Sequence, residues 1–117
     1  MSKVSFLLEL AIKDGQLEAF KEMARGLIET VKDGEPGTLT YQVRIAEDGK
    51  HCLFHDVYKD SEALLTHLGN VGPRLPGLFE IAPIKRFDVL GPASQDVRVA
   101  LADFSPNYFP DFAGFDR

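Results

Sequence analysis

Short segments of alternating apolar and polar residues constrain the fold of this chain more than any other feature of its sequence. In the first such segment, a wholly apolar set of residues alternates with a mixed set, which is typical of a strand with one buried face. The apolar set is Val4, Phe6, Leu8, Leu10 and Ile12. The same alternation predicts strands over residues 38–45, 52–58 and 84–90, and Asp48-Gly49 is a hairpin turn signal between two of them.

Between these strands, the spacing of apolar residues changes to that of helices. Residues 15–33 predict a long amphipathic helix, which we expect to end at a left-handed Gly34 before Pro36. A second helix should begin at Asp60 or Ser61 and be interrupted within residues 69–80, where glycines and prolines occur. The order strand, helix, strand, strand, helix, strand predicts an α+β domain of the ferredoxin-like βαββαβ plan.

We divide the chain into this domain, residues 1–92, and a C-terminal extension, residues 93–117. Ser94 is expected to cap a short helix at the start of the extension. The extension is rich in aromatic side chains, which are uncommon in disordered tails: Phe104, Tyr108, Phe109, Phe112 and Phe115. We therefore expect it to be ordered and mostly buried, and to pack on the domain or on a partner subunit.

Charge and composition exclude several classes of protein. The 117 residues carry a formal net charge of −5 with no basic cluster, which argues against nucleic acid or an anionic membrane as a partner. No apolar run reaches the roughly 20 residues of a membrane span, and no signal peptide precedes the first strand. With a single cysteine, Cys52, these features predict a cytoplasmic location.

A homodimer is expected from the size and plan of the domain. A chain of this length buries only about two-thirds of its unfolded surface. In the βαββαβ plan both helices cover one face of the sheet, which leaves the other face free for a second copy. Leu7, Ala11 and Val57 are candidates for that interface, or else their neighbours on the opposite face of the strands, depending on which face the helices cover.

Three segments, in this order, give the sequence a resemblance to a known family: Glu35 to Tyr41, Phe54 to Asp60, and His67-Leu68. Together with the order of elements they resemble the antibiotic biosynthesis monooxygenase family of dimeric α/β barrels over roughly residues 4–91. The resemblance implies a dimer whose sheets pack face to face, with a cavity between sheet and helices. Activities in the family include cofactor-independent oxygenation of anthrones and quinols, haem degradation, and isomerisation of a phosphorylated sugar.

The sequence departs from the family pattern at several positions. Where the haem-degrading branch has an asparagine and a tryptophan, this chain has Leu8 and His67, so haem degradation is disfavoured. The second histidine found in many members is replaced by Gly72, and the strand motif has His55 and Asp56 in place of tyrosine and glutamate.

His67 is the first candidate for a catalytic group. A neutral imidazole at the edge of the cavity could take a proton from a phenol or hydroquinone, because its pKa is close to neutral pH. The alternative is a histidine at the edge of the core with a hydrogen bond to the backbone. The family's His-Leu motif supports the catalytic interpretation.

Asp56 is the second candidate, because aspartate is unusual in the middle of a strand. One interpretation is an ion pair across the dimer interface, to Arg44 or Arg86; the other is the orientation of a catalytic group.

Tyr58 shares the strand face of Asp56, whereas His55 lies on the opposite face. Tyr41, His55 and Tyr58 are predicted substrate contacts, and His55 is expected to pair with Tyr41 across the hairpin.

Asn70, Arg74 and Phe79 complete the predicted substrate site at the mouth of the cavity. Asn70 and Arg74 could instead serve only for helix capping and solvation, although Arg74 could also hold an anionic group. No spacing of metal ligands, phosphate loop or dinucleotide motif is present, so no cofactor is predicted. The leading hypothesis is a cofactor-independent monooxygenase for a small aromatic substrate; the alternative is a non-catalytic dimeric module that binds a small apolar ligand.

Overall fold

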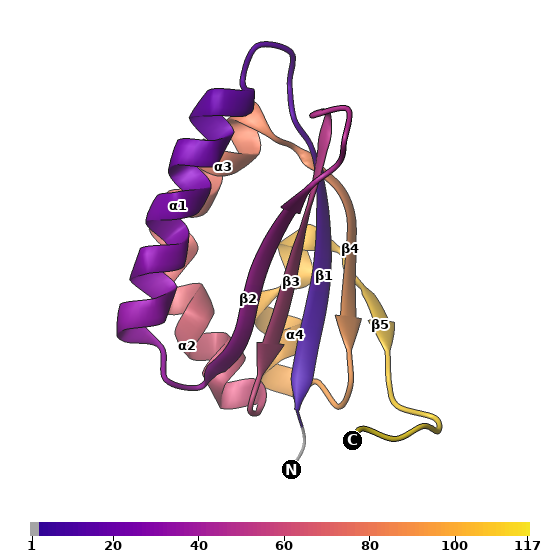
Figure 1. Ribbon diagram of the computed structural model, residues 1–117. Coiled ribbons are helices and arrows are strands. Elements are labelled where there is room, and N and C mark those ends of the chain that lie inside the picture. The colour runs from indigo at the N-terminus through magenta and orange to yellow at the C-terminus, as the bar shows by residue number, and fades with distance from the viewer. Residues whose placement is uncertain (1–2) are drawn as a thin grey trace.

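The computed structural model describes residues 3–117 as one sheet with helices against one of its faces (Figure 1). The strands are β1 (Val4–Ala11), β2 (Thr38–Ile45), β3 (His51–Tyr58), β4 (Ile84–Leu90) and β5 (Asn107–Phe109). The helices are α1 (Leu17–Gly34), α2 (Ser61–Val71), α3 (Leu75–Ile81) and α4 (Gln95–Ala100). Two 3₁₀ turns, η1 (Gly72–Arg74) and η2 (Ala102–Phe104), follow α2 and α4.

The strand order in the sheet is β2-β3-β1-β4-β5. The first four strands pair antiparallel, with β1 between β3 and β4, and this arrangement confirms the predicted ferredoxin-like α+β plan. The fifth strand was not predicted: β5 pairs parallel with β4 over three residues. It covers the edge of β4, which would otherwise present unpaired backbone groups.

The core lies between the sheet and the helices, and the alternation in β1 decides which residues enter it. Val4, Phe6, Leu8 and Leu10 are buried on the helix side, whereas the residues between them are only half-buried. In α1 the buried residues fall at helical spacing and pack against this face: Phe20, Ala24, Leu27 and Val31. Each large apolar side chain removed from water contributes about 1.5–3 kcal/mol, so the apolar stripe fixes which face each element turns inward.

Two predicted helix boundaries can be compared with the structure. Asp60 caps α2, because its side chain accepts a hydrogen bond from the backbone N–H of Ala63 at 2.9 Å. The expectation for Gly34 is wrong: α1 continues through it, and Glu35 is the C-cap, with φ −133°. A Cβ at position 34 would lie 3.3 Å from the Asn70 side chain, so glycine here makes room for a neighbouring helix.

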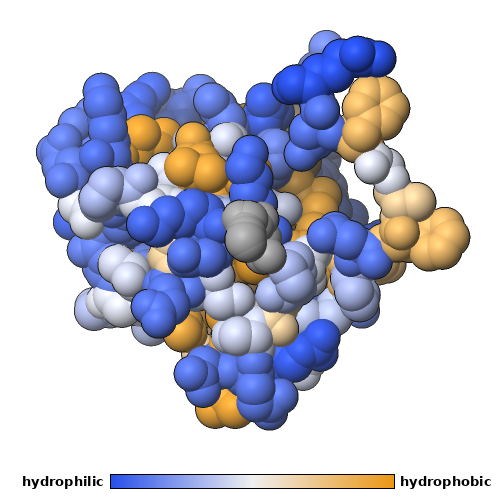
Figure 2. Space-filling view, turned by 90° about the horizontal axis from the view of Figure 1, so that it is seen from below, coloured by the Kyte–Doolittle hydropathy of each residue, from blue (hydrophilic) through white to orange (hydrophobic). Residues whose placement is uncertain are grey.

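The C-terminal extension begins with α4, which packs beside α2. Ser94 caps it by accepting a hydrogen bond from the N–H of Val97, and Val97 and Leu101 are buried. After β5 the chain leaves the sheet, and Phe112 and Phe115 are 100% and 77% exposed on this single chain. Figure 2 shows apolar side chains standing clear of the main body of the molecule.

Within residues 3–117, no helix is both long enough and apolar enough to cross a lipid bilayer.

Candidate active site

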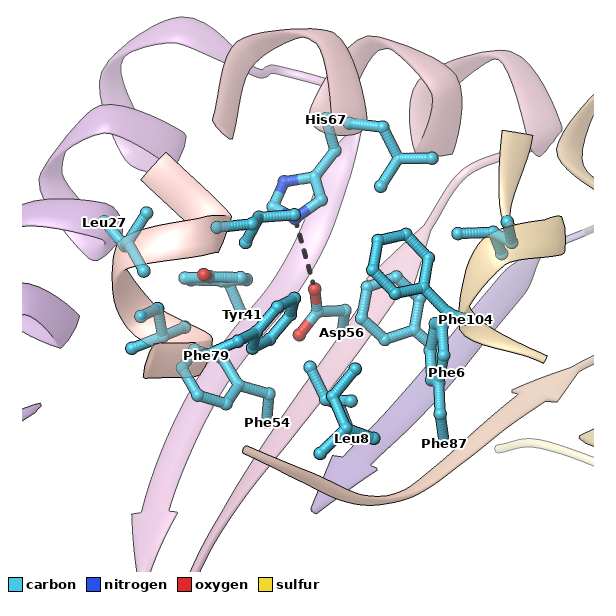
Figure 3. Close-up of a pocket in the computed structure, with 15 residues that line it drawn as sticks. Phe6, Leu8, Leu27, Tyr41, Phe54, Asp56, His67, Phe79, Phe87 and Phe104 are labelled. Carbon is cyan, nitrogen blue, oxygen red and sulfur yellow. Dashed lines mark ion pairs between the residues drawn. The ribbon is translucent and has the colours of Figure 1, made fainter. Parts of the chain in front are cut away.

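An apolar cavity lies between the sheet and α2, α3 and η2, and an imidazole and a carboxyl group reach it (Figure 3). Its walls are aliphatic side chains and six aromatic rings, and each ring comes from a different element: Phe6, Tyr41, Phe54, Phe79, Phe87 and Phe104. His67 enters from α2 and Asp56 from β3. The cavity volume is about 40 Å³, little more than the share of one water molecule in the liquid, roughly 30 Å³.

His67 is fixed from behind by a carboxylate. It is 4% exposed, and its Nδ1 lies 2.8 Å from Oε1 of Glu35. When Nδ1 donates its proton to this oxygen, Nε2 is left unprotonated as an acceptor. His67 is therefore paired with a side chain and not with the backbone, and the atom that could accept a further proton is on the cavity side of the ring.

Glu35 is held in place by its own hydrogen bonds. Oε1 also accepts from Oγ1 of Thr38 at 2.7 Å, and Oε2 accepts from Nδ2 of Asn70 at 2.8 Å. Both oxygens are acceptors, as expected of an ionised carboxylate. Gly37 allows this turn to approach α2 closely, because a Cβ there would lie 2.8 Å from the Cβ of Ala63.

Asp56 faces the helices and is 1% exposed. Its Oδ2 accepts a hydrogen bond from the Tyr58 hydroxyl at 2.6 Å and lies 3.6 Å from Nε2 of His67, which is too long for a hydrogen bond. Its other oxygen, Oδ1, is buried and has no hydrogen-bond partner within residues 3–117. In Figure 3 one carboxyl oxygen points to His67 and the other turns away from it, toward the aromatic wall.

Burial sets the protonation of this cluster. Loss of solvation raises the pKa of Asp56 from 3.8 to about 8; the Tyr58 hydrogen bond lowers it in part, and the negative charge of Glu35 raises it again. Burial also lowers the pKa of His67 below 6.5, against the opposing effect of Glu35. At neutral pH the cavity thus contains a neutral imidazole beside a protonated carboxyl group.

The phenols next to the cluster are held in their neutral form. Burial, followed by the charge of Asp56, raises the pKa of both Tyr41 and Tyr58 well above its usual value. The Tyr41 and His67 ring centroids are 5.4 Å apart. Tyr58 does not line the cavity but acts through Asp56, as its hydrogen-bond donor.

Five of the eight residues expected at the site lie together, and three have other positions or roles. His67, Asp56, Tyr41 and Phe79 line the cavity, and Tyr58 contacts Asp56. Asn70 is exposed and reaches the cluster only through Glu35.

His55 and Arg74 lie away from the cavity. His55 is on the helix-free face of the sheet, where it pairs with Leu7 and Gln42; the expected pairing with Tyr41 is not found, since Tyr41 lies opposite Asp56. Arg74 is exposed, with its guanidinium against α1 near Gly26.

These contacts also exclude the other predicted role of Asp56, an ion pair with an arginine. An ion pair of Asp56 with Arg44 or Arg86 is ruled out, because Asp56 is buried on the helix side of the sheet. Arg44 is exposed, and Arg86 pairs with Asp88 at 2.8 Å. Glu35 was not among the predicted site residues. In the sequence Glu35 is marked only by its position in the Glu35-Pro36-Gly37 turn, and this turn was interpreted as the end of the first helix.

The model of the family described as antibiotic biosynthesis monooxygenase matches residues 4–72, more than half of the chain. The chain belongs to the antibiotic biosynthesis monooxygenase family. The match includes Glu35, Asp56 and His67, whereas α3, β4 and the C-terminal extension lie beyond it. Membership of this family supports a function resembling that of a monooxygenase or of a small-molecule-binding protein.

Solved structures extend the likeness to the full chain. MupZ from Pseudomonas fluorescens is 30% identical, with a TM-score of 0.90 over all of this chain and 96% of that protein. Rv0793 from Mycobacterium tuberculosis is 19% identical, with a TM-score of 0.67 over 80% of this chain and 98% of its own. A conserved protein from Methanosarcina mazei Go1 is 20% identical, with a TM-score of 0.65 over 76% and 89%. The last two share the family's fold. No curated protein sequence matches this chain.

Among residues 3–117, no group of three or more histidine, cysteine, aspartate or glutamate side chains is placed to hold a metal ion.

Proposed function

We propose that this protein is a cofactor-independent monooxygenase that acts on a small aromatic substrate, such as a hydroquinone or a polyketide anthrone. The observation that carries the proposal is the orientation of His67: Nδ1 is bound to Glu35, and Nε2 faces a cavity walled by aromatic rings. A base in this position is preorganised to take a proton from a bound aromatic molecule. The family of the chain supports the same class of reaction.

The proposed reaction needs no electron donor other than the substrate. His67 removes a proton from the ring CH₂ of an anthrone, and the resulting carbanion transfers electrons to dioxygen and forms a carbon–oxygen bond. Loss of water then gives the quinone. One oxygen atom enters the product, the other leaves as water, and the four electrons taken up by dioxygen come from the oxidised carbon. The apolar walls exclude water, which would otherwise protonate the carbanion.

Substrate binding requires the cavity to open. A volume of about 40 Å³ is far below the roughly 300–1,000 Å³ of typical ligand sites. The ring centroids of Phe79 and Phe104 lie 6.0 Å apart, and both side chains are only half-buried. Both belong to short elements, α3 and η2, so we expect these two rings to move aside when substrate enters.

We also propose that the protein is a cytoplasmic homodimer, joined through the sheet face that no helix covers. Leu7, Ala11 and Val57 are half-buried on that face in the single chain. A second sheet packed there would remove them from water and stabilise the small domain. Sedimentation at micromolar protein concentration should give a dimer, and a monomer would contradict this part of the proposal.

Oxygen uptake with anthrone and a panel of hydroquinones tests the activity. His67→Ala should reduce turnover by a factor of about 10²–10⁴, the usual contribution of a general base. The matched control is His51→Ala, because His51 lies beside Glu9 at the far end of β3, outside the cavity. That variant should keep wild-type turnover.

Absence of uptake above buffer with every compound would refute the oxygenase proposal. If the same compounds raise the melting temperature without being changed, the protein is instead a non-catalytic binder of small aromatic ligands.

A further inference from the structure

One fully buried side-chain oxygen at the cavity, Oδ1 of Asp56, has no hydrogen-bond partner within residues 3–117. A buried polar atom without a partner costs about 1–3 kcal/mol, so it needs an explanation. The Asp56 side chain lines the cavity and is 1% exposed. A ligand in the cavity is the partner that its position allows.

Whether Oδ1 donates or accepts a hydrogen bond follows from its surroundings. Oδ2 already accepts from the Tyr58 hydroxyl at 2.6 Å, and Nε2 of His67 at 3.6 Å is too far to share a proton with it. Since burial keeps this carboxyl group protonated at neutral pH, with a pKa of about 8, the proton belongs on the free oxygen. Oδ1 is then a buried donor of a residue that lines an apolar cavity.

We propose that Asp56 is a catalytic acid, whose Oδ1–H donates a hydrogen bond to a carbonyl oxygen of the substrate and stabilises the negative charge that forms there. This inference rests on the proposed function of His67 as the base. It also narrows the substrate class, from aromatic compounds in general to aromatic ketones with an acidic C–H bond.

The relative positions of the base and the acid support this class. Nε2 of His67, from the helix layer, lies 3.6 Å from Oδ2 of Asp56, the carboxyl oxygen next to the proposed donor, and both side chains line the cavity. An aryl alkyl ketone presents its acidic α-carbon and its oxygen two bonds apart, so one small group can meet both residues. In anthrone the acidic CH₂ lies across the ring from the oxygen, and its electron pair reaches the oxygen through that ring. The C–H proton passes to Nε2, the electron pair moves onto the oxygen, and Oδ1–H binds the resulting enolate. An ionised Asp56 would repel that charge.

The test uses two probes of the same shape, acetophenone and α-methylstyrene. They differ in having a carbonyl oxygen or a CH₂ group at the same position, and neither ionises between pH 7 and 9. Dissociation constants from NMR titration give the preference of each variant for the ketone. That preference should be about tenfold greater in the wild type than in Asp56→Leu, the value of one buried hydrogen bond.

Asp56→Asn is the second variant, because an amide retains a donor at this position but does not titrate. It should keep most of the preference for the ketone. In the wild type the preference should decline between pH 7 and 9, as the carboxyl group loses its proton, and in Asp56→Asn it should remain constant. If Asp56→Leu does not fold, the pH dependence alone decides the question.

Each result bears on one proposal. Equal preference for the ketone in all three proteins, no change with pH in the wild type, or failure of both probes to bind overturns the role of Asp56. Absence of anthrone oxidation with the ketone preference intact would instead remove the oxygenase proposal and leave Asp56 as the donor in a ketone-binding site.

Discussion

Asp56→Asn should change the pH dependence of folding stability, since Asp56 binds a proton in the folded chain that it loses on unfolding. Its pKa is raised from 3.8 to about 8 in the fold. Between these values the folded state holds one more proton than the unfolded state, so stability falls as pH rises, by about 1.4 kcal/mol per pH unit. Above pH 8 the folded carboxyl group also ionises, and the dependence flattens.

The magnitude can be worked out for the range from pH 6.5 to 8.5. A carboxyl group with a pKa of about 8 has lost roughly three-quarters of its proton by pH 8.5, and integration over the range gives a loss of about 1.9 kcal/mol. His67 acts in the opposite direction, because a lowered histidine pKa destabilises the fold only at acid pH. Its contribution declines above pH 6.5 and is common to both proteins.

Urea unfolding followed by circular dichroism suits this chain, because it has no tryptophan. At a fixed protein concentration, the wild type should lose about 1.9 kcal/mol more than Asp56→Asn from pH 6.5 to 8.5, which corresponds to roughly 6–10 °C in melting temperature. Asp88→Asn is the matched control. Asp88 is also a buried strand carboxylate, but it lies on the opposite face and is paired with Arg86 and Asn107.

The control variant should keep the wild-type pH dependence, because it retains Asp56. Parallel stability curves for the wild type and Asp56→Asn would refute the reasoning: Asp56 would then be ionised at neutral pH, and its role as an acid would be lost with it.

Three further predictions concern the remaining parts of the molecule. Glu35→Gln removes the charge that supports protonation of His67, so the acid limb of the kcat profile should move to lower pH and kcat should fall about 10-fold or more. Phe104→Ala should open the cavity and lower the KM for bulky anthrones while costing about 1–3 kcal/mol of stability, measured by urea unfolding. Ending the chain after Leu101 removes β5 and η2 and should lower the melting temperature by more than about 5 °C. Ending it after Pro110 should leave the melting temperature of the single domain unchanged, because Phe112 is fully exposed.

Much of the fold could be predicted from the sequence because its elements are defined by local rules. Alternation of apolar residues located the four long strands, and the side-chain caps at Asp60 and Ser94 form as their residue types predict. Within the segment expected to interrupt the second helix, Pro76 lies in the first turn of α3. In each case the residue satisfies its preference through neighbours close in sequence.

The parts that could not be predicted depend on contacts between distant segments. β5 is only three residues long and pairs parallel with β4, so no alternation of useful length marks it. The bond between Glu35 and His67 joins residues 32 positions apart, through a turn whose sequence signalled only the end of a helix. Gly34 was expected to be left-handed, but its absent side chain instead admits Asn70, a contact that no local pattern specifies.

Asp56 is the residue at which local and global rules disagree, and that disagreement could have been taken further from the sequence alone. It shares a strand face with Phe54 and Tyr58, and β3 pairs with β1 so that this face continues the wholly apolar face of β1, with Asp56 opposite Phe6. Such a face must turn toward the helices, which excludes solvent and the dimer interface as partners for the carboxyl group. A strand aspartate buried in this way must either pair with a cation or hold a proton. Since the nearest basic group, His67, is itself engaged by Glu35, the proton on Asp56 is a consequence of the fold, and it leaves a neutral acid beside a neutral base in one apolar cavity.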